Sequence, residues 1–410
     1  MPSADFRVVQ TESRPCRASR VGAVVTGADY RGLGLVRSLG RKGIPVCVLR
    51  HDDHWLAGFS RFANRSFAWP PGNDDERAAF LVRLAEKHGL EGWVLLPTDD
   101  EAVSVISRQH ERLASVFQLT TPPWNQLRRA VDKRLLYRLA LNLGIDQAWT
   151  HLPSGQDDLA TLDCPFPAVI KPATRERFNP LTSVKAWRVD NREALVARYA
   201  EARRFLPAGA LLVQEMIPGG GEAQFSYSAI CRAGRPLAWI TARRERQYPM
   251  DFGRASTYVE TVDEPGVVHP SERLLAALGI TGIVEIEYKR DPRDNRFKLL
   301  DVNPRVWGWQ TLCGRAGVDF PYLLWQLVHG QPVPELKGRP GVRWVRMSVD
   351  LPTALREIVG GRLSLIQYLR SLTGPIESAI FARDDPLPGL FELPLIIHLA
   401  GKRILQRRAV

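Results

Sequence analysis

The stretch IVEIEYKRDPRDNRFKLLDVNPRVWGW, residues 283–309, decides the fold of this chain. It predicts two short strands joined by a polar turn. Side chains two apart lie on one face of a strand, so Glu285 and Glu287 point the same way. The same rule groups the polar residues of the second strand, which are Asp301, Asn303 and Arg305. If odd-numbered residues pair with odd-numbered ones, three carboxylates and an amide oxygen converge beside one arginine.

The opposite faces of the two strands are apolar, as a buried core requires. They carry Val284, Ile286 and Tyr288 on the first strand and Leu300 and Val302 on the second. Carboxylate and amide oxygens suit Mg²⁺, which proteins usually hold with one or two carboxylates and substrate phosphates. The alternative is a solvent-exposed charged face on an ordinary hairpin. The hairpin alone favours neither interpretation, so the rest of the chain has to decide.

The size and composition of the chain indicate a globular protein with several domains. Its 410 residues exceed the size at which single cores stop growing, so two or three domains are expected. The five cysteines form no CxxC pair, which argues against a disulfide framework or a zinc site and favours a reducing compartment. Residues 1–20 predict a disordered tail and not a signal peptide. No apolar run approaches the roughly 18 residues that span a bilayer, so we expect a cytoplasmic protein.

The net charge of +12 does not by itself indicate a nucleic-acid partner. The arginines are spread through the chain, and no DNA- or RNA-binding signature accompanies them. We therefore expect no nucleic acid among the partners. Only nine of the 56 basic residues are lysines, which makes each lysine worth inspecting. Lys133, Lys171 and Lys185 fall where a phosphate-binding site would need them.

A parallel, helix-covered sheet is expected at the start of the chain. Residues 21–26 predict a strand, the glycine-containing segment after them a helix, and residues 44–49 a second strand. The glycines at 27, 32 and 34 match neither GxGxxG nor a P-loop, so they favour tight-turn packing over dinucleotide binding. This makes a dehydrogenase a distant alternative. Asp99 or Thr98 either caps a helix or faces a ligand at a strand's carboxyl end.

The middle of the chain alternates between predicted strands and helices. The predicted elements are helix 74–88, strand 92–96, helical linker 124–143, strand 165–171, helix 191–205 and strand 210–217. A Pro-Gly-Gly-Gly-Glu turn ending at Glu222 closes the last of these strands. Beyond residue 330 the chain is rich in proline and glycine, and we expect no polar constellation there.

Six segments in order resemble the ATP-grasp superfamily, and most closely its carboxylate–amine ligases, such as the D-aspartate ligase-like enzymes. They are VVTGADYRGLGLVRSLGRKG, LLPTDDEAV, DKRLLYRLALNLGI, FPAVIKP, LLVQEMIPGGGE and GIVEIEYKRDPRDNRFKLLDVNPRVWGW, within about residues 21–330. The resemblance implies an α/β and α+β fold, in which a parallel pre-ATP-grasp domain precedes two facing subdomains that grip ATP. The implied boundaries are a disordered tail 1–20, a pre-ATP-grasp domain 21–121, an ATP-grasp domain 122–330 with subdomains 122–213 and 214–330, and a small extension 331–410.

The resemblance also implies roles for single residues. Lys133, Lys171 and Lys185 would hold the phosphates of ATP, since an ammonium group is a compact charge suited to phosphate. Gln214, Glu215 and Ile217 would read adenine, and Glu222 would contact the ribose hydroxyls. The alternative for Glu215 and Glu222 is plain exposure at a glycine-rich turn. Glu287, Asp301 and Asn303 would bind Mg²⁺, or Mn²⁺ in its place, whereas Glu285 matches less well because the family's ligand is the later acid of such a pair.

The anionic substrate has its own implied residues. By resemblance Arg305 would grip the acyl phosphate or carboxylate, and together with Lys171 it is expected to be catalytic. Arg243, Arg244 and Arg246, expected just after a strand, either join that pocket or lie on a solvated loop. The chain departs from the family in its phosphate-covering loop, because residues 173–183 contain no glycine. Side-chain cations take the place of backbone amides there, or the loop is ordered differently.

The expected activity is ADP-forming ligation. ATP would convert a carboxylate into an acyl phosphate, and an amine would displace the phosphate, which splits one difficult step into two easier ones. The alternatives are a carboxylase that uses bicarbonate and an inactive nucleotide-binding regulator. The expected partners are a small carboxylic acid, an amine and a second copy in a homodimer. The apolar and basic segment 390–410 either touches an anionic membrane surface or packs as a terminal helix on the third domain.

Overall fold

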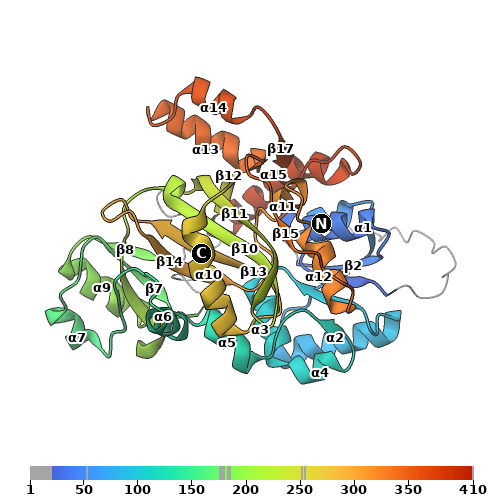
Figure 1. Cartoon of the computed structure of the whole chain (residues 1–410), viewed down its shortest axis with the longest axis horizontal. Coiled ribbons are helices and arrows are strands. Elements are labelled where there is room, and N and C mark those ends of the chain that lie inside the picture. Colours follow the sequence, from blue (N-terminus) through green and yellow to red (C-terminus); the bar gives the residue numbers. More distant parts are fainter. Residues whose placement is uncertain are drawn as a thin grey trace.

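The computed structural model describes residues 21–51, 54–174, 181, 186–250, 253 and 255–408. Within these ranges the chain forms three β-sheets that lie side by side, with a lobe of helices above them in Figure 1. This mixed α/β architecture, with a parallel sheet first and antiparallel sheets after it, confirms the predicted fold class. The proposed domain boundaries stay a proposal, and the hydrogen-bonded sheet crosses the one at residue 330.

The first sheet is parallel and has the order β3-β2-β1-β4-β5. Its strands are β1 (Ala23–Thr26), β2 (Val46–Arg50), β3 (Ala63–Ala68), β4 (Val94–Pro97) and β5 (Gln118–Leu119). The helices around it are α1 (Tyr30–Arg41), η1 (Leu56–Phe59), α2 (Asp74–His88), α3 (Asp100–Arg108) and α4 (His110–Ala114). Asp99 caps α3 by accepting a hydrogen bond from the Ala102 amide at 2.8 Å, as one interpretation of the sequence expected.

The glycines after β1 serve close packing. A Cβ on Gly32 would lie 1.9 Å from the carbonyl oxygen of Gly27, and one on Gly34 would lie 1.8 Å from the Gln310 amide nitrogen. Any larger residue would push α1 off the end of β1 or away from the segment that follows the hairpin. These contacts support the tight-turn interpretation over dinucleotide binding.

The second sheet has the order β6-β9-β7-β8 among the described residues. Its strands are β6 (Thr150–His151), β7 (Ala168–Pro172), β8 (Trp187–Val189) and β9 (Leu211–Glu215), and its neighbours are α5 (Trp124–Val131), α6 (Lys133–Asn142), α7 (Gln156–Thr161), α9 (Arg192–Ala202) and η2 (Ala208–Ala210). The helical linker predicted over 124–143 consists of two helices, because the chain breaks at Asp132. That residue is extended, and its carboxylate caps α6 by accepting from the Arg134 amide at 3.0 Å.

The third sheet is the largest and runs β14-β13-β10-β11-β12-β16-β17, with β15 beside β11. Its strands are β10 (Gln224–Arg232), β11 (Arg235–Tyr248), β12 (Ala255–Val262), β13 (Gly282–Arg290), β14 (Phe297–Asn303), β15 (Leu336–Lys337), β16 (Arg343–Val345) and β17 (Ile376–Ser378). The accompanying helices are η3 (Gly221–Ala223), α10 (Pro265–Leu278), α11 (Thr311–Arg315), α12 (Phe320–Val328), α13 (Met347–Val359), α14 (Leu365–Ser371) and α15 (Leu387–Arg408). The strands β15, β16 and β17 tie the end of the chain to the sheet that carries the hairpin.

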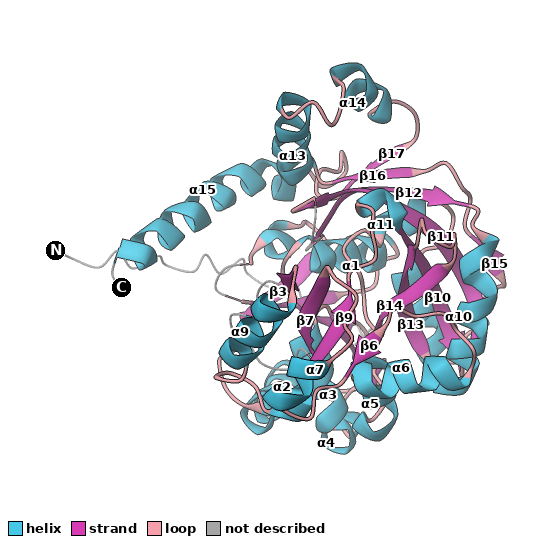
Figure 2. Ribbon diagram, turned by 90° about the vertical axis from the view of Figure 1, so that its left-hand side faces the viewer, coloured by secondary structure: helices cyan, strands magenta, loops and turns pink. Residues whose placement is uncertain are grey.

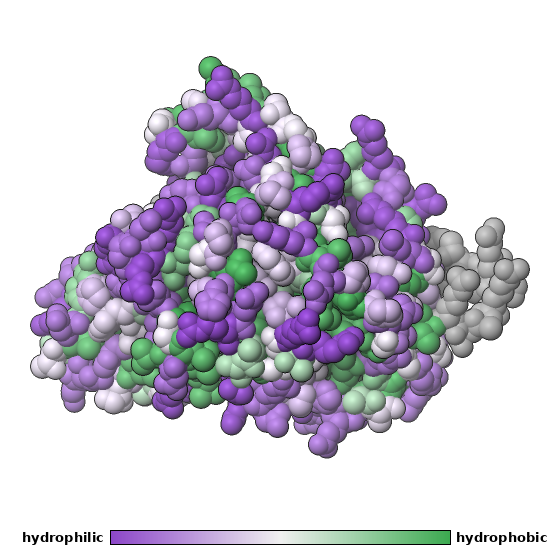
Figure 3. All heavy atoms as spheres, viewed as in Figure 1, coloured by the Kyte–Doolittle hydropathy of each residue, from purple (hydrophilic) through white to green (hydrophobic). Residues whose placement is uncertain are grey.

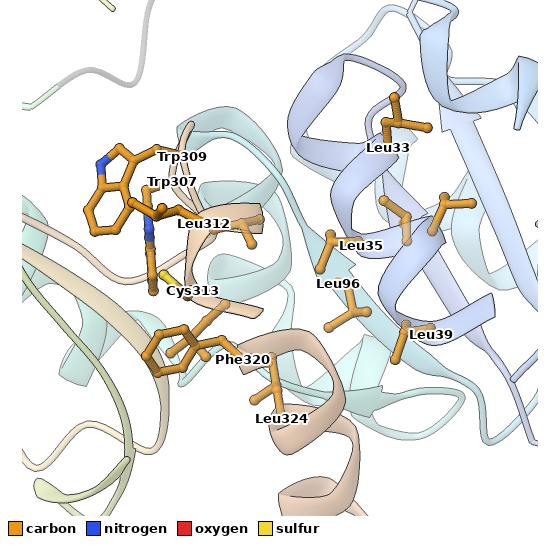
Figure 4. Packing of buried hydrophobic residues seen from close by; sticks show 14 of the residues in the cluster. Leu33, Leu35, Leu39, Leu96, Trp307, Trp309, Leu312, Cys313, Phe320 and Leu324 are labelled. Atoms are coloured by element: carbon orange, nitrogen blue, oxygen red, sulfur yellow. The ribbon is translucent and has the colours of Figure 1, made fainter. Parts of the chain in front are cut away.

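One apolar core joins the first sheet to the segment after the hairpin. Figure 4 shows Leu33, Leu35 and Leu39 of α1 facing the residues of α11 and α12, with Trp307 and Trp309 at the far side. These side chains are almost completely buried. Burial of each large apolar side chain contributes about 1.5–3 kcal/mol, so this core fixes the hairpin relative to the parallel sheet.

The expectation of no polar constellation beyond residue 330 is wrong. Asp350 of α13 forms a two-pronged ion pair with Arg246 of β11, at 2.9 and 2.8 Å. Asp385 accepts from the Arg37 guanidinium of α1 at 2.9 Å and is almost completely buried. Charges so distant in sequence find each other only in the folded chain, which is why composition did not reveal them.

The last helix leaves the body of the protein. Its first turns lie against η1, where Phe391 stacks on Phe59 with ring centroids 4.3 Å apart. Figure 2 shows the remainder of α15 extending outward from the sheets. Across the described ranges no helix combines the length and the apolar character that crossing a bilayer demands.

Candidate active site

The hairpin pairs in the predicted register. Glu285 lies opposite Asn303 and Glu287 opposite Asp301 on the antiparallel strands β13 and β14. The Asn303 amide nitrogen donates to the Glu287 carboxylate at 2.9 Å and to the Glu285 carboxylate at 3.2 Å. Since both carboxylates need a donor, the Asn303 Oδ1 atom points away from them. It lies 3.5 Å from a guanidinium nitrogen of Arg305.

A β-bulge beyond Glu287 changes the apolar face of the second strand. Tyr288 pairs with Leu299, so Leu300 is the extra residue on β14. Leu299 is completely buried and Leu300 only half-buried, so the prediction that Leu300 faces the core is wrong. The bulge presents the Leu300 carbonyl to α6, where it accepts a hydrogen bond from the Tyr137 hydroxyl at 2.8 Å.

Glu285 is a buried support for the site. Its carboxylate accepts hydrogen bonds from the Ser226 hydroxyl at 3.0 Å and the Trp309 indole at 3.1 Å. Burial, and next the charge of Glu287, raises the pKa of Glu285 to about 7. One Glu285 oxygen thus accepts from Ser226 and Trp309, and the other accepts from the Asn303 amide that also reaches Glu287, so Glu285 stands beside Glu287 as a supporting acid.

Two lysines lie near the hairpin, one in contact with it and one linked to it through Tyr137. Lys133, the first residue of α6, places its ammonium 2.8 Å from the Asp301 carboxylate and is 5% exposed. Lys171 of β7 donates to the Tyr137 hydroxyl and to the Gln214 side-chain oxygen, both at 2.7 Å. Tyr137 lies one helical turn after Lys133, so one helix face serves both lysines.

Charged side chains on β9, on β13 and on the turn after β13 fix the backbone that follows β9. Glu215 accepts from the Trp149 amide at 2.9 Å and from the Arg293 guanidinium at 2.8 Å. The Lys289 ammonium donates to the carbonyl oxygens of Ile217 and Gly219 at 2.8 and 2.6 Å. These contacts fix the backbone expected to read adenine.

Of the remaining residues predicted to bind the nucleotide, the structure describes Glu222 but not Lys185. Glu222 is exposed and accepts from the Gly220 amide at 2.9 Å. Lys185 lies outside the described residues, and so does most of the glycine-free loop 173–183.

Arg305 connects the hairpin to the parallel sheet. Its guanidinium donates to the Asp100 carboxylate at 2.5 Å, at the start of α3. Beside this pair lies a small cavity of about 40 Å³ that opens to solvent. Its polar lining is Asp100, Ser104, Lys133, Thr174, Asp301 and Asn303. Its apolar lining is Val103, Trp124, Leu127, Val131, Val302 and Pro304.

The three arginines expected after a strand lie within β11, so the prediction of a loop is wrong. Arg243 pairs with Glu245 on its own strand. Arg244 donates to the Gln224 side chain at 2.5 Å and lies 3.5 Å from the Glu287 carboxylate. The Arg246 guanidinium is ion-paired with Asp350. Only Arg244 therefore adjoins the hairpin, because strand alternation and the bulges in β11 turn the other two elsewhere.

Sequence reasoning missed several supporting residues. Tyr137 was detectable by its spacing of four from Lys133, and Lys289 by its place two after Glu287. Ser226 and Trp309, which hold Glu285, carry no such local signal. Asp100 belongs to the segment LLPTDDEAV, but its partner Arg305 is 205 residues away.

The side chains at the hairpin fit a magnesium ion held together with phosphates. Glu287 and Asp301 supply carboxylate oxygens, and Asn303 would add its amide oxygen once its side-chain amide, whose nitrogen donates to Glu285 and Glu287, turns over. No three His, Cys, Asp or Glu side chains in the described part of the chain gather to hold a metal by themselves. Two carboxylates plus phosphate oxygens are what Mg²⁺ commonly takes, so the set would be completed by the nucleotide.

Comparisons with known proteins agree with this arrangement. Residues 209–348 match the family described as ATP-grasp in the biosynthetic pathway with Ter operon. The carbamoyl phosphate synthase large chain of Thermomicrobium roseum is 22% identical over 337 residues. That alignment takes in 77% of this chain but only 30% of the relative, so this chain spans less than a third of its length.

Solved structures share the fold at low sequence identity. The L-amino acid ligase of Bacillus licheniformis superposes with a TM-score of 0.58 at 15% identity, covering 76% of this chain and 75% of its own. The N5-carboxyaminoimidazole ribonucleotide synthetase of Thermus thermophilus gives 0.56 at 19%, covering 78% and 81%. The matched segment contains both strands of the hairpin. Residues 209–348 are thus similar to an ATP-grasp family, and the chain shares the fold of the two solved structures.

Proposed function

We propose that the protein is an ATP-dependent carboxylate–amine ligase, which activates an acid as an acyl phosphate and releases ADP and phosphate. One observation carries the proposal, namely that Lys133 lies 2.8 Å from Asp301. This contact brings a cation from α6 against the hairpin carboxylates of a different sheet. A cation and a metal-binding carboxylate placed together are suited to a triphosphate, which needs both kinds of neutralisation at once.

The nucleotide would lie between the second sheet and the hairpin. The ammonium groups of Lys133 and Lys171 would contact its phosphates, and Glu287, Asp301 and Asn303 would hold Mg²⁺. The bound ion would neutralise charge on the terminal phosphates during transfer. The backbone between Glu215 and Ile217 would receive adenine, because Lys289 and Arg293 already fix its position.

The first step transfers the γ-phosphoryl group to the acid. A carboxylate oxygen attacks the γ-phosphorus, the bond to the bridging oxygen breaks, and that oxygen leaves with ADP. Arg305 would orient the acid, since its guanidinium stands beside the cavity and lies 3.5 Å from the Asn303 Oδ1 atom. Orientation of this kind lowers the barrier by making the attack effectively intramolecular.

The second step joins the amine to the activated acid. The amine nitrogen attacks the acyl carbon, the carbon–oxygen bond to phosphate breaks, and the nitrogen loses a proton. Trp124, Leu127 and Val131 are among the residues that line the cavity, which supports a substrate with an apolar part.

A phosphate-release screen of carboxylic acids against amines and amino acids tests the proposal. Bicarbonate is included as an acid, so that the screen also detects carboxylase activity. With the correct acid but no amine, hydroxylamine should intercept the acyl phosphate and give a hydroxamate with one ADP for each product. The Glu287→Gln variant serves as the control and should give neither product. Formation of AMP and pyrophosphate with the identified acid would refute the mechanism.

A further inference from the structure

Helix α13 exposes an apolar face to solvent and turns its acidic residues toward the body of the protein. Its exposed face is an apolar row at intervals of four residues, formed by Met347, Leu351, Leu355 and Val359. These side chains are 43%, 41%, 50% and 89% exposed. A helix on a protein surface normally buries such a row against the core. In α13 the row faces outward along the whole length of the helix.

A buried ion pair fixes this orientation, because Asp350 is completely buried and bound to Arg246 of β11. Glu357 on the same face is 6% exposed and accepts two hydrogen bonds from the exposed Arg362, at 2.6 and 2.8 Å. Rotating α13 to bury the apolar row would carry Asp350 into water and leave the guanidinium of Arg246 buried without its partner. The cost of that rotation holds the row outward.

The next helix continues the apolar surface. Leu365, Ile366 and Leu369 of α14 are 54%, 61% and 55% exposed. Together the seven residues of α13 and α14 form what we term the apolar lobe. Figure 1 shows these two helices projecting above the sheets, and in Figure 3 hydrophobic atoms lie among hydrophilic ones on this projection. Seven exposed large apolar side chains gathered on two helices are typical of an interaction site.

The exposed charged side chains of the segment that carries the apolar lobe have one sign, and the nearby acid Glu392 of α15 is half-buried and bonded to Ser348. Between residues 347 and 375, all of which the structure describes, the exposed charged side chains are Arg356, Arg362 and Arg370. The two acids of this segment, Asp350 and Glu357, are buried. An apolar face rimmed by arginines complements a surface that has an apolar interior and anionic groups at its edge.

We propose that the apolar lobe docks the protein on an anionic phospholipid bilayer. The apolar side chains would enter the boundary between headgroups and acyl chains, and Arg356 and Arg370 would contact the lipid phosphates. A second copy of the chain is the weaker occupant, since facing lobes would bring these arginines together. Helix α15 adds a second apolar stretch, with Leu390, Leu393 and Ile397 all more than 60% exposed.

Co-sedimentation with vesicles tests the proposal. The full chain should bind vesicles of phosphatidylcholine with about a third phosphatidylglycerol, and bind phosphatidylcholine alone at least tenfold more weakly. The double variant Leu355→Glu/Val359→Glu should lose anionic binding by tenfold or more. Leu141→Glu is the matched control, because Leu141 is 67% exposed on α6, outside the lobe, and its substitution should change nothing. Melting temperatures verify that every variant is folded.

Two further variants measure the separate contributions of the lobe arginines and of helix α15 to vesicle binding. Arg356→Glu/Arg370→Glu should weaken binding to anionic vesicles and leave binding to phosphatidylcholine as it was. Leu393→Glu/Ile397→Glu should have a smaller effect than the α13 variant if the lobe is the principal contact. Absence of wild-type binding would overturn the proposal. So would a wild-type dimer in sedimentation equilibrium that Leu355→Glu/Val359→Glu converts to monomer, since the lobe would then be a protein interface.

Discussion

The ion pair between Arg246 and Asp350 should be among the most sensitive points of the fold. Asp350 is completely buried, and both of its oxygens accept from Arg246, at 2.9 and 2.8 Å. The guanidinium also lies 4.1 Å from the ring centroid of Tyr258 and 5.0 Å from that of Tyr368. Asp350→Asn keeps the shape of the side chain but leaves this buried guanidinium without its counter-charge.

The expected loss in free energy of unfolding follows from the burial of this ion pair. Removing one partner of a buried ion pair costs about 3–5 kcal/mol, a large part of the roughly 5–15 kcal/mol by which domains are stable. The double variant Arg246→Met/Asp350→Leu should lose less than Asp350→Asn alone, because no uncompensated charge remains. Urea unfolding at pH 7 measures the free energies of unfolding, and the double-mutant cycle isolates the interaction.

An exposed ion pair supplies the control. Arg235 and Glu335 lie 2.6 Å apart but are 76% and 71% exposed, so Glu335→Gln should cost less than about 1 kcal/mol. If Asp350→Asn costs no more than this control, the Arg246–Asp350 pair is not desolvated in solution. The account of what holds α13 in place would then be wrong, and with it the reason for its outward apolar row.

Three further predictions concern the proposed site and the pH dependence of stability. Lys171→Ala should weaken ATP binding about tenfold or more in calorimetric titration, whereas Lys337→Ala, an exposed control, should not; equal affinities would remove Lys171 from the site. Glu287→Gln should stay folded, because it removes a charge beside Glu285, yet lose the rise in melting temperature that Mg-ATP gives; a retained rise would make the hairpin acids structural. Burial raises the pKa of Asp319, so its contribution to stability should be lost as pH rises through that pKa, and Asp319→Asn should lose less stability than the wild type between pH 4 and pH 8 in urea unfolding; an equal loss would contradict this.

Local patterns in the sequence predicted the hairpin and its register. Alternation of side chains depends only on the strand itself, so the spacing of Glu287 and Asp301 is sufficient to place them together. The βαβ start of the chain and the cap at Asp99 are equally local. The bulge at Leu300 escaped prediction because an extra residue in a ladder depends on the partner strand and on α6, which receives the displaced carbonyl.

Contacts between distant segments were beyond sequence reasoning. Arg246 was expected either in an anionic pocket or on a solvated loop, because nothing near it in the chain showed that Asp350, 104 residues later, would neutralise it. The outward orientation of the apolar row of α13 could not be predicted for the same reason. Its apolar spacing alone would predict a buried face, and only the paired acids on the opposite face reverse that orientation.

The site and the apolar core are connected through one side chain. Trp309 packs in the core between the parallel sheet and α11, and its indole donates to the Glu285 carboxylate at 3.1 Å. Glu285 in turn accepts from the Asn303 amide at 3.2 Å, which leaves the Asn303 oxygen directed away from the acids. A change in core packing that moves Trp309 would therefore release Glu285 and allow the Asn303 amide to turn. The direction of a proposed metal ligand thus depends on apolar packing, because the hydrogen bonds that orient the ligand begin in the core.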